Sequence, residues 1–359
     1  MIEIDGSLGE GGGQMRQMLR TALSLSCVTG KPFHIFNIRR MRPKPGLMRQ
    51  HQVAVQSAAC ISSAEVLGDQ IGSVELTFLP KAVAPANYDI AIGTAGSTTM
   101  VLQTLIPPLL TSHDTSRIAL SGGTHVPFSP SWEYLTEIFS PVMARLGARL
   151  DFVLDSCGFY PKGGGRVRCR IEPAASFSPL EAVHRGKLLR IVGASAVGNL
   201  PITIAERQAH AATLRLREHL GEHLPVAIDI RNLKMPGQGT FIFLKAEYEN
   251  AVAGFTSLGE RGKPAELVGE EAALELIGHH DTGMPVDPHL ADQLVLYLAQ
   301  ATGPSRYATS RLTSHLRTNL EVTALFLDFK VEVDGEWEGP GTVTITPRPG
   351  ARKGSTVQR

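Results

Sequence analysis

YDIAIGTAGSTTMVLQT, residues 88–104, sets the architecture that the sequence predicts. Within it we predict a strand at Tyr88–Ile92, a glycine-rich turn at Gly93–Thr98 and an apolar helix over about 97–112. The turn leads into a helix N-terminus, where free backbone N–H groups can hold an anion. Turns of this kind are nevertheless more often purely structural, so the segment alone predicts a fold and leaves a phosphate site open.

The same order of elements precedes and follows this segment. Before it we predict strands at Met1–Asp5, His34–Ile38 and Val74–Phe78, a turn at Gly9–Gln14 (GEGGGQ), and helices at about 15–28 and 46–63. After it we predict strands at Arg117–Ser121, 149–154 and 166–172, and a helix at about 130–147. Two or three such alternations occur in many α/β proteins, so the pattern leaves both an ordinary α/β fold and a triplicated one open.

A third pass of the pattern is interrupted. Its predicted elements are helices at about 287–301 and 313–327 and strands at Tyr307–Ser310, Lys330–Val333 and Thr342–Thr346. The interrupting segment has the pattern of a small α/β unit, with strands at 187–193, 226–230 and 240–247 and helices at 202–220 and 268–277. We therefore expect an α+β fold of repeated units, divided as 1–183, an inserted domain at 184–277, 278–350 and a polar tail at 351–359.

Composition narrows the class of protein. The chain has 359 residues, 43% of them hydrophobic, and a net charge of +1, so contact with nucleic acid requires a local basic cluster. The four cysteines show no CxxC spacing, which predicts neither a disulfide framework nor a zinc site and favours a reducing compartment. We find no signal-peptide pattern and no long apolar run, so we expect a soluble cytoplasmic protein.

TSHLRTN, residues 313–319, contains the strongest candidate for a catalytic residue. Thr313 or Ser314 is a suitable N-cap, which places His315 in the first turn of a helix. The positive helix end disfavours imidazolium and attracts phosphate, so a neutral histidine there suits nucleotidyl transfer to nitrogen. A lone histidine at a helix start is more often a surface or capping residue, and spacing alone does not exclude that interpretation.

The segment IRRMRPKPGLMRQH, Ile38–His51, concentrates basic residues in an otherwise balanced chain. Arginine binds phosphate oxygens in a bidentate manner, which suits a terminal phosphate, although a solvated basic loop is an equal alternative. Aromatic residues do not alternate with the basic ones, which favours a grip on an RNA end over a long single-strand track.

Further candidates are weaker. In HLADQL, His289–Leu294, Asp292 can hold a ribose hydroxyl or a metal-bound water and Gln293 a base or phosphate, or Asp292 simply complements the helix dipole. The glycine-rich YPKGGG, Tyr160–Gly165, offers N–H groups to an anion, but no P-loop motif is present. His279, His280 and Asp281 are adjacent on a helix end and therefore point apart, which argues against a metal site.

Together, GEGGGQ…LRTALSLS, IRRMRPKPGLMRQH, IGTAGSTTMVLQT, SGGT, GFYPKGGG, HLADQLVL and TSHLRTN resemble the RNA 3′-terminal phosphate cyclase family, in the same order and over nearly the whole chain. The resemblance implies three βαβαββ repeats, related to enolpyruvyl transferases, with a small inserted α/β domain in the third repeat. It implies an ATP-dependent enzyme that converts an RNA 3′-terminal phosphate into a 2′,3′-cyclic phosphate. Its partners are then ATP and RNA with a 3′-terminal phosphate, without a membrane; the oligomeric state stays open.

The resemblance also implies roles for individual residues. By it His315 attacks the α-phosphorus of ATP to form enzyme-histidine-AMP, AMP passes to the RNA 3′-phosphate to give RNA-ppA, and the vicinal 2′-OH closes the ring and releases AMP. The ATP-contacting positions are Gln103, His289, Leu290, Ala291, Asp292 and Gln293. The positions that hold phosphate or RNA are Arg20, Arg39, Arg42 and Gln50, and Glu10 is the ligand of Mg²⁺ or Mn²⁺.

The chain departs from the family pattern at one place near its start. The family reads GGGQ followed directly by [IM]LR, whereas here GGGQ is followed by MRQMLR, an apparent duplication of three residues. Arg16 is therefore an alternative to Arg20 for the phosphate role. His289 stands where an aromatic residue is common. The rival functions are a relative without the nucleophilic histidine that acts in ribosomal RNA maturation, an enolpyruvyl transferase, and a purely RNA-binding protein.

Overall fold

The first two sheets follow one another along the chain. The computed structural model describes residues 1–7, 14–40 and 42–348, with the backbone alone for residues 14–16. The first sheet region comprises β1 (Ile2–Asp5), α1 (Gln14–Thr29), β2 (Phe33–Phe36), α2 (Arg49–Ser62), β3 (Glu65–Leu67) and β4 (Leu76–Leu79). The second comprises β5 (Asn87–Ala91), α3 (Thr98–Leu110), β6 (Ser116–Gly122), α4 (Trp132–Tyr134), η1 (Leu135–Phe139), α5 (Ser140–Arg145), β7 (Arg149–Ser156) and β8 (Gly165–Glu172).

Both sheets have the same pattern of pairing. The strand orders are β1-β2-β4-β3 and β5-β6-β8-β7. In each, the first two strands are parallel and the remaining neighbours are antiparallel. The predicted strands and helices of this half are confirmed to within a few residues. The helix predicted at 130–147 is continuous through α4, η1 and α5 but contains one π-helical stretch, and the three-residue strand β3 was not predicted.

A third sheet joins segments that are far apart in the sequence. Its strands are β9 (Glu181–Ala182), β14 (Ser305–Thr309), β15 (Phe329–Gly335) and β16 (Gly341–Pro347), in the order β15-β16-β14-β9. Again β9 and β14 are parallel, and the other pairs are antiparallel. Its helices are α8 (Pro288–Leu298) and α9 (Ser314–Phe326). Between β9 and α8 the chain forms other elements, which do not belong to this sheet.

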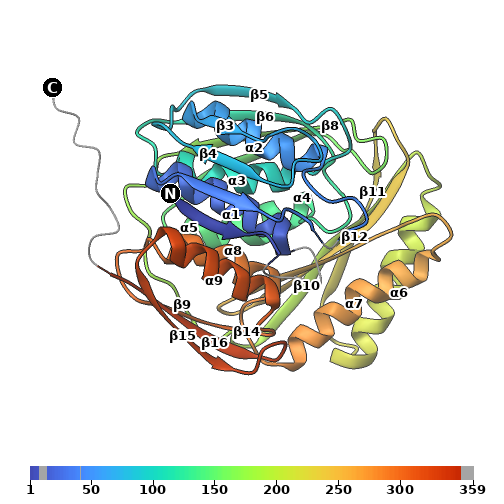
Figure 1. Ribbon diagram of the computed structural model, residues 1–359. Coiled ribbons are helices and arrows are strands. Elements are labelled where there is room, and N and C mark those ends of the chain that lie inside the picture. Colours follow the sequence, from blue (N-terminus) through green and yellow to red (C-terminus); the bar gives the residue numbers. More distant parts are fainter. Residues whose placement is uncertain (8–13, 41, 349–359) are drawn as a thin grey trace.

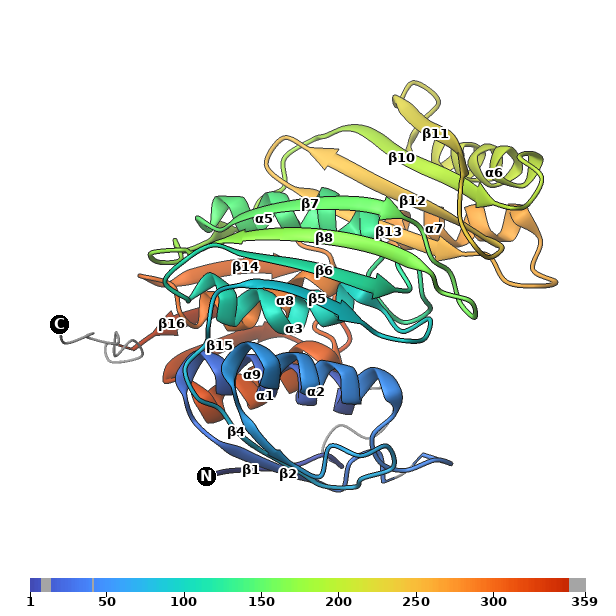
Figure 2. The same cartoon turned by 90° about the horizontal axis from the view of Figure 1, so that it is seen from above.

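The interrupting segment forms a fourth sheet with two helices. It comprises β10 (Leu188–Gly198), α6 (Thr203–Leu220), β11 (Val226–Leu233), β12 (Gly239–Tyr248), β13 (Val252–Leu258) and α7 (Ala265–Asp281), with the strand order β11-β10-β12-β13. Alternation along β12 separates two apolar faces: Ile242 and Leu244 pack toward α6 and α7, whereas Phe241 and Phe243 join the main core. The sheet therefore packs its helices on one face and the rest of the molecule on the other (Figure 2).

The helices of the first three sheets meet in the middle of the molecule (Figure 1). Helix α1 packs against α2, α3 and α9, and α8 packs against α9. Nearly every side chain of α3 is buried, which explains why its sequence is apolar on all sides. The chain is thus a mixed α/β protein of the α+β class. No helix in the described ranges is both long and apolar enough to cross a bilayer.

The backbone of the glycine-rich turn before α3 packs closely against the backbone of the loop that follows β6. The Ser97 hydroxyl caps α3 by accepting from the N–H of Met100 at 3.2 Å. The N–H of Thr98 donates to the carbonyl of Gly123 at 2.8 Å. A Cβ on Gly123 would lie 2.5 Å from the carbonyl oxygen of Ala95, so only glycine fits. This contact fixes the N-terminus of α3 beside the loop that follows β6.

Candidate active site

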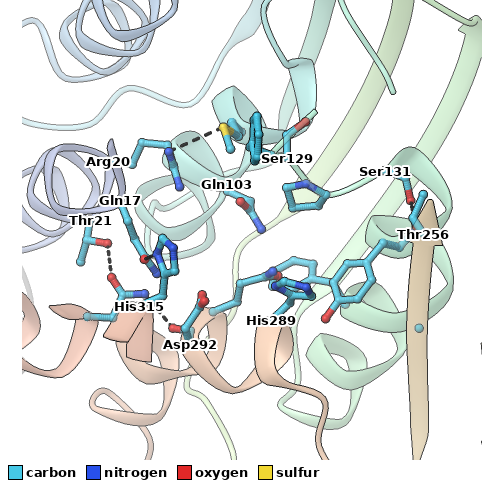
Figure 3. A pocket seen from close by; sticks show the side chains of 18 of the residues that line it. Gln17, Arg20, Thr21, Gln103, Ser129, Ser131, Thr256, His289, Asp292 and His315 are labelled. Atoms are coloured by element: carbon cyan, nitrogen blue, oxygen red, sulfur yellow. Dashed lines mark hydrogen bonds between the residues drawn. The ribbon is translucent and has the colours of Figure 1, made fainter. Parts of the chain in front are cut away.

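A cavity of about 600 Å³ opens between the central helices and the fourth sheet. Figure 3 shows side chains from α1, α3, α8 and α9 converging on it. The helices contribute Gln17, Arg20, Thr21, Ser24, Met100, Gln103, His289, Asp292, Gln293, Leu296, Tyr297, His315 and Asn319. The loops and the remaining elements contribute Arg42, Phe128, Ser129, Pro130, Ser131, Tyr134, Phe139, Gly254, Phe255, Thr256 and Glu275. Most of the residues predicted to be functional are therefore brought together in one place.

His315 stands in the first turn of α9, as its sequence predicted. The hydroxyl of Thr313 accepts from the N–H of Leu316 at 3.1 Å and so caps the helix, and the N–H of Ser314 donates to Glu338 Oε1 at 3.0 Å. These contacts hold the positive end of the helix macrodipole at the cavity. The imidazole is partly buried on the cavity wall.

The amide of Gln17 fixes the protonation of the His315 ring. Its Oε1 lies in hydrogen-bond contact with Nδ1 of His315. Because an amide oxygen only accepts, Nδ1 carries the proton and Nε2 keeps its lone pair. Burial lowers the pKa of His315, and the nearby Arg20 guanidinium and the His289 side chain lower it further, against a smaller opposing effect of Glu338. The side chain is therefore a neutral imidazole with a nucleophilic Nε2 at neutral pH.

The predicted phosphate-binding residues divide into two groups. Arg20 and Arg42 line the cavity, and Arg20 is close enough to His315 to affect its pKa. Gln50 lies just behind this wall, where its amide contacts the sulfur of Met100 at 3.0 Å. Arg39 does not line the cavity and donates to the carbonyl of Gly46 at 3.2 Å, within its own loop.

Two carboxyl groups lie at the start of α8: Asp292 is half-buried and lines the cavity, whereas Asp287 is fully buried and does not line it. The pKa of Asp292 is raised to about 8, mainly by burial and also by the neighbouring Asp287, while Arg20 and a hydrogen bond from Gln17 oppose this rise. Asp287 accepts from the hydroxyl of Tyr134 at 2.7 Å and caps α8 through the N–H groups of His289 and Leu290, both at 3.0 Å. Asp292 therefore holds a proton at neutral pH until a cationic ligand displaces it.

Two amide side chains on the cavity wall lack partners. The Nε2 of Gln103 and the Oε1 of Gln293 are buried and make no hydrogen bond within the described residues. Buried amide groups are normally satisfied, so these two atoms indicate a missing polar ligand. Leu290 and Ala291, in contrast, are buried in the core at 2% and 0% exposure and do not line the cavity.

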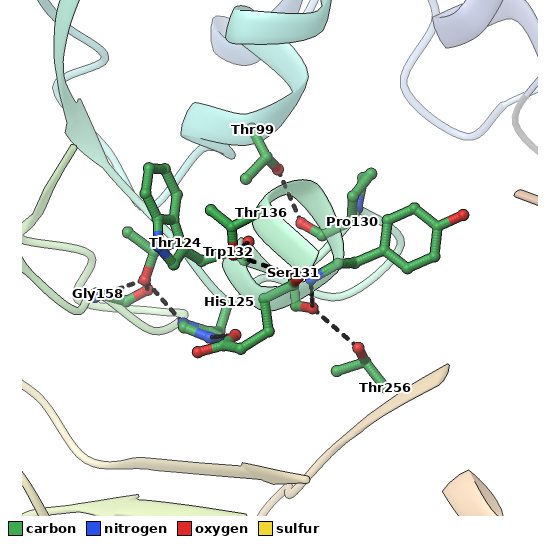
Figure 4. Close-up of polar contacts among 11 residues, drawn as sticks. Thr99, Thr124, His125, Pro130, Ser131, Trp132, Thr136, Gly158 and Thr256 are labelled. Atoms are coloured by element: carbon green, nitrogen blue, oxygen red, sulfur yellow. Dashed lines mark hydrogen bonds and ion pairs between the residues drawn. The ribbon is translucent and has the colours of Figure 1, made fainter. Parts of the chain in front are cut away.

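The loop between β6 and α4 closes one side of the cavity (Figure 4). The hydroxyl of Thr99 donates to the carbonyl of Pro130 at 2.8 Å, and the hydroxyls of Ser131 and Thr256 lie 2.9 Å apart. The second contact ties the loop to β13 of the fourth sheet. Deeper inside, Nε2 of His125 lies 2.6 Å from the carboxylate of Glu133. The loop is therefore fixed by hydrogen bonds to α3 and β13 and by the contact of its His125 with Glu133 of α4.

Sequence reasoning missed several residues of this site. Gln17 precedes Arg20 by one helical turn on α1, but it fell within the apparent duplication and no role was assigned to it. Glu275, on α7, was missed because the interrupting segment was treated as separate from the site; burial raises its pKa, partly offset by His289. Glu10 lies outside the described residues, as does the side chain of Arg16. Across the described ranges no three potential metal ligands cluster.

Comparison with known proteins identifies the family to which the chain is similar. The model of the family described as RNA 3′-terminal phosphate cyclase matches residues 8–333. A protein named RNA 3′-terminal phosphate cyclase from Saccharolobus solfataricus is 45% identical over 337 residues, which cover 94% of this chain and 97% of that protein. The protein of the same name from Pyrobaculum aerophilum is 44% identical over 330 residues, covering 92% and 93%. That from Pyrobaculum neutrophilum is 42% identical over 334 residues, covering 93% and 95%.

The fold and the cavity describe a mixed α/β protein of the α+β class whose polar pocket is lined by a histidine at a helix N-terminus. The chain belongs to the RNA 3′-terminal phosphate cyclase family. Membership confirms the family resemblance read from the sequence motifs and the expectation that the chain is an enzyme.

Proposed function

We propose that the chain converts an RNA 3′-terminal phosphate into a 2′,3′-cyclic phosphate at the expense of ATP, through enzyme-histidine-AMP and RNA-ppA intermediates. The observation that carries this proposal is the contact between Gln17 and Nδ1 of His315, which leaves a neutral imidazole with its Nε2 lone pair at the cavity. A neutral nitrogen nucleophile at a helix N-terminus, beside Arg20, suits attack on a phosphorus atom.

In the first step Nε2 of His315 attacks the α-phosphorus of ATP. A nitrogen–phosphorus bond forms, the bond from the α-phosphorus to the bridging oxygen breaks, and pyrophosphate leaves. Arg20 and Arg42, on the same wall, stabilise the negative charge of the phosphates. Gln103 and Gln293 offer their unpaired amide atoms to the nucleoside, together with His289 and Asp292. Leu290 and Ala291 support this wall from the core.

In the later steps an oxygen of the RNA 3′-phosphate attacks the AMP phosphorus, and the nitrogen–phosphorus bond breaks. The 2′-OH then loses its proton and attacks the activated 3′-phosphorus, AMP leaves, and the five-membered ring closes. This closure is intramolecular, so little entropy opposes it. The requirement for a 2′-OH makes RNA the substrate in preference to DNA. Two further residues contribute to phosphate binding: Gln50, which lies behind the cavity wall, and Arg39, which lies in the adjoining loop.

The proposal includes a divalent cation, because Mg²⁺ typically binds few carboxylates and completes its shell with substrate phosphates and water. Glu10, together with Asp292 once that carboxyl group has lost its proton, would hold the ion, Mg²⁺ or Mn²⁺. Such an ion neutralises triphosphate and pyrophosphate charge.

We further propose that the first three sheets are three βαβαββ repeats of one ancestral unit. Their shared strand order and pairing support this. The fourth sheet is then a domain of about residues 184–277 inserted into the third repeat, with residues 1–183 and 278–350 forming the repeats. Its separate apolar cluster supports treating it as a unit.

The test uses ATP labelled at the α- or the γ-phosphate, incubated with the protein and a divalent cation. We expect label from the α-position alone to stay on the protein, to be acid-labile, and to move to RNA that carries a 3′-phosphate. The variant His315→Asn should retain the fold and lose the label. His219→Asn, at an exposed position on α6, is the matched control and should label as the unmodified protein does. Label on His315→Asn would overturn the assignment.

A further inference from the structure

Phe128 is the most unusual residue of the loop between β6 and α4. Its side chain is 90% exposed, and its backbone has a φ of +63°. A left-handed backbone is unfavourable for a bulky residue, and a fully exposed aromatic ring gains nothing from burial. The position therefore carries a conformational cost without a packing benefit, and such outliers point to function.

The loop holds this conformation from both ends. The hydroxyl of Ser129 donates to the carbonyl of Val126 at 2.7 Å, directly across Phe128. On the C-terminal side, Thr99 donates to Pro130 and Ser131 contacts Thr256. Figure 4 shows the contacts of Thr99 with Pro130 and of Ser131 with Thr256. The surrounding structure thus presents the ring to solvent at a fixed place.

That place is the rim of the cavity. Phe128 lines the cavity together with Arg42, which is exposed and belongs to the basic segment Ile38–His51, called the basic loop below. His315 and Asp292 line the same cavity and are half-buried, so they are more covered than Phe128 and Arg42. From the rim inward, the cavity therefore presents an aromatic ring, cationic groups and then the nucleophile. A single-stranded RNA end presents a base and then its phosphate in the matching order.

We propose that Phe128 is a stacking platform for the base of the terminal nucleotide of the RNA substrate. The proposal rests on the function proposed above and adds a base-binding subsite to it. A stacked base is held without hydrogen-bond recognition of its edge, so the subsite accepts all four bases. The basic loop has no aromatic side chain that could stack on a base, and Phe128, in the loop between β6 and α4, then supplies one.

The adenine of ATP is the other base that might be assigned to this ring, and the geometry disfavours it. The unpaired amide atoms of Gln103 and Gln293 are buried, so the polar contacts that can recognise a nucleotide edge lie inside the cavity. A ring exposed at the rim instead suits a base whose chain continues into solvent.

The experiment compares Phe128→Asn with Phe128→Trp. Asparagine tolerates the left-handed backbone and removes the ring, whereas tryptophan keeps an aromatic face. Tyr160→Asn, an exposed aromatic position off the cavity wall, is the control. We measure the anisotropy of a fluorescent RNA with a 3′-phosphate at equilibrium, the single-turnover transfer of AMP to that RNA, and the rate of protein-AMP formation without RNA.

For Phe128→Asn we expect weaker RNA binding, with the Kd raised roughly 5- to 150-fold as for loss of one base–aromatic stack. We expect unchanged protein-AMP formation and a melting temperature no lower than that of the unmodified protein. Phe128→Trp and Tyr160→Asn should bind RNA as the unmodified protein does. An RNA whose terminal nucleotide lacks its base should bind weakly to the unmodified protein and no more weakly to Phe128→Asn.

Each contrary result is decisive. Unchanged RNA binding by Phe128→Asn overturns the subsite. A raised requirement for ATP with unchanged RNA binding assigns the ring to adenine and also overturns it. If the unmodified protein forms no AMP adduct, the proposed function fails, but equilibrium binding of the two RNAs still decides the role of Phe128.

Discussion

Replacing Gln17 by leucine tests the link between hydrogen bonding and the nucleophile. In the structure the Gln17 amide accepts the proton of Nδ1 of His315 and also hydrogen-bonds Asp292. Leucine keeps the volume and leaves Nδ1 without this acceptor. Because the ring is only partly buried, we take the lower part of the range for an unsatisfied polar group, about 1–2 kcal/mol. This corresponds to protein-AMP formation roughly 5- to 30-fold slower.

The variant Gln17→Glu separates a catalytic effect from a structural one. A carboxylate next to Nδ1 favours the imidazolium, so it raises the pKa of His315, which burial and Arg20 now hold below its ordinary value. Attack on ATP needs the neutral ring, so the acid limb of the rate profile should move to higher pH. We expect a large loss of rate at pH 6 and near-normal rates well above neutral pH.

The assay is a quench-flow measurement of label transferred from ATP to the protein between pH 5.5 and 9. Gln56→Leu, an exposed glutamine on α2, is the control and should leave the profile unchanged. Equal rates for Gln17→Leu and the unmodified protein, or a Gln17→Glu profile without a shift, would refute the reasoning.

Two further predictions concern stability. Asp292 has a pKa of about 8 in the folded protein and an ordinary value of 3.8, so its contribution to stability is complete below about pH 4 and is lost as pH rises through 8. Urea midpoints of Asp292→Asn should therefore change less between pH 5 and pH 8 than those of the unmodified protein; identical slopes contradict this. Phe128→Gly removes a left-handed bulky residue that buries little surface, so it should raise stability by about 0.5–1 kcal/mol, seen as a melting temperature higher by roughly 1–3 °C. A lower melting temperature would show that the ring packs in solution.

Local pattern was sufficient to predict most elements of the fold. Helix α1 and strand β8 have apolar residues at spacings typical of a helix and a strand, and both were predicted to within a few residues. The strands β3 and β9, of three and two residues, are too short to have a pattern of their own. They form because they pair with the edges of β4 and β14. Local sequence does not reveal such pairing, because it depends on the tertiary structure.

The site was predictable only where its residues lie in distinctive motifs. His315 was found because TSHLRTN combines a cap and a histidine, and the family resemblance gave the histidine a role. Glu275 lies on a helix of the fourth sheet, and nothing local shows that this helix reaches the cavity. Phe128 was missed because its significance lies in a backbone angle and an exposure, neither of which spacing reveals.

The parallel pairing of β9 with β14 has a consequence for synthesis on the ribosome. Ala182 lies opposite Tyr307, so β9 must wait for the whole of the fourth sheet and α8 to be made before it finds its partner. Helix α1, among the first elements to emerge, likewise depends on α9, to which Thr21 is joined through Asn319. His315, the proposed nucleophile, is therefore translated after α1, α3 and α8, and a chain that lacks α9 cannot assemble the cavity.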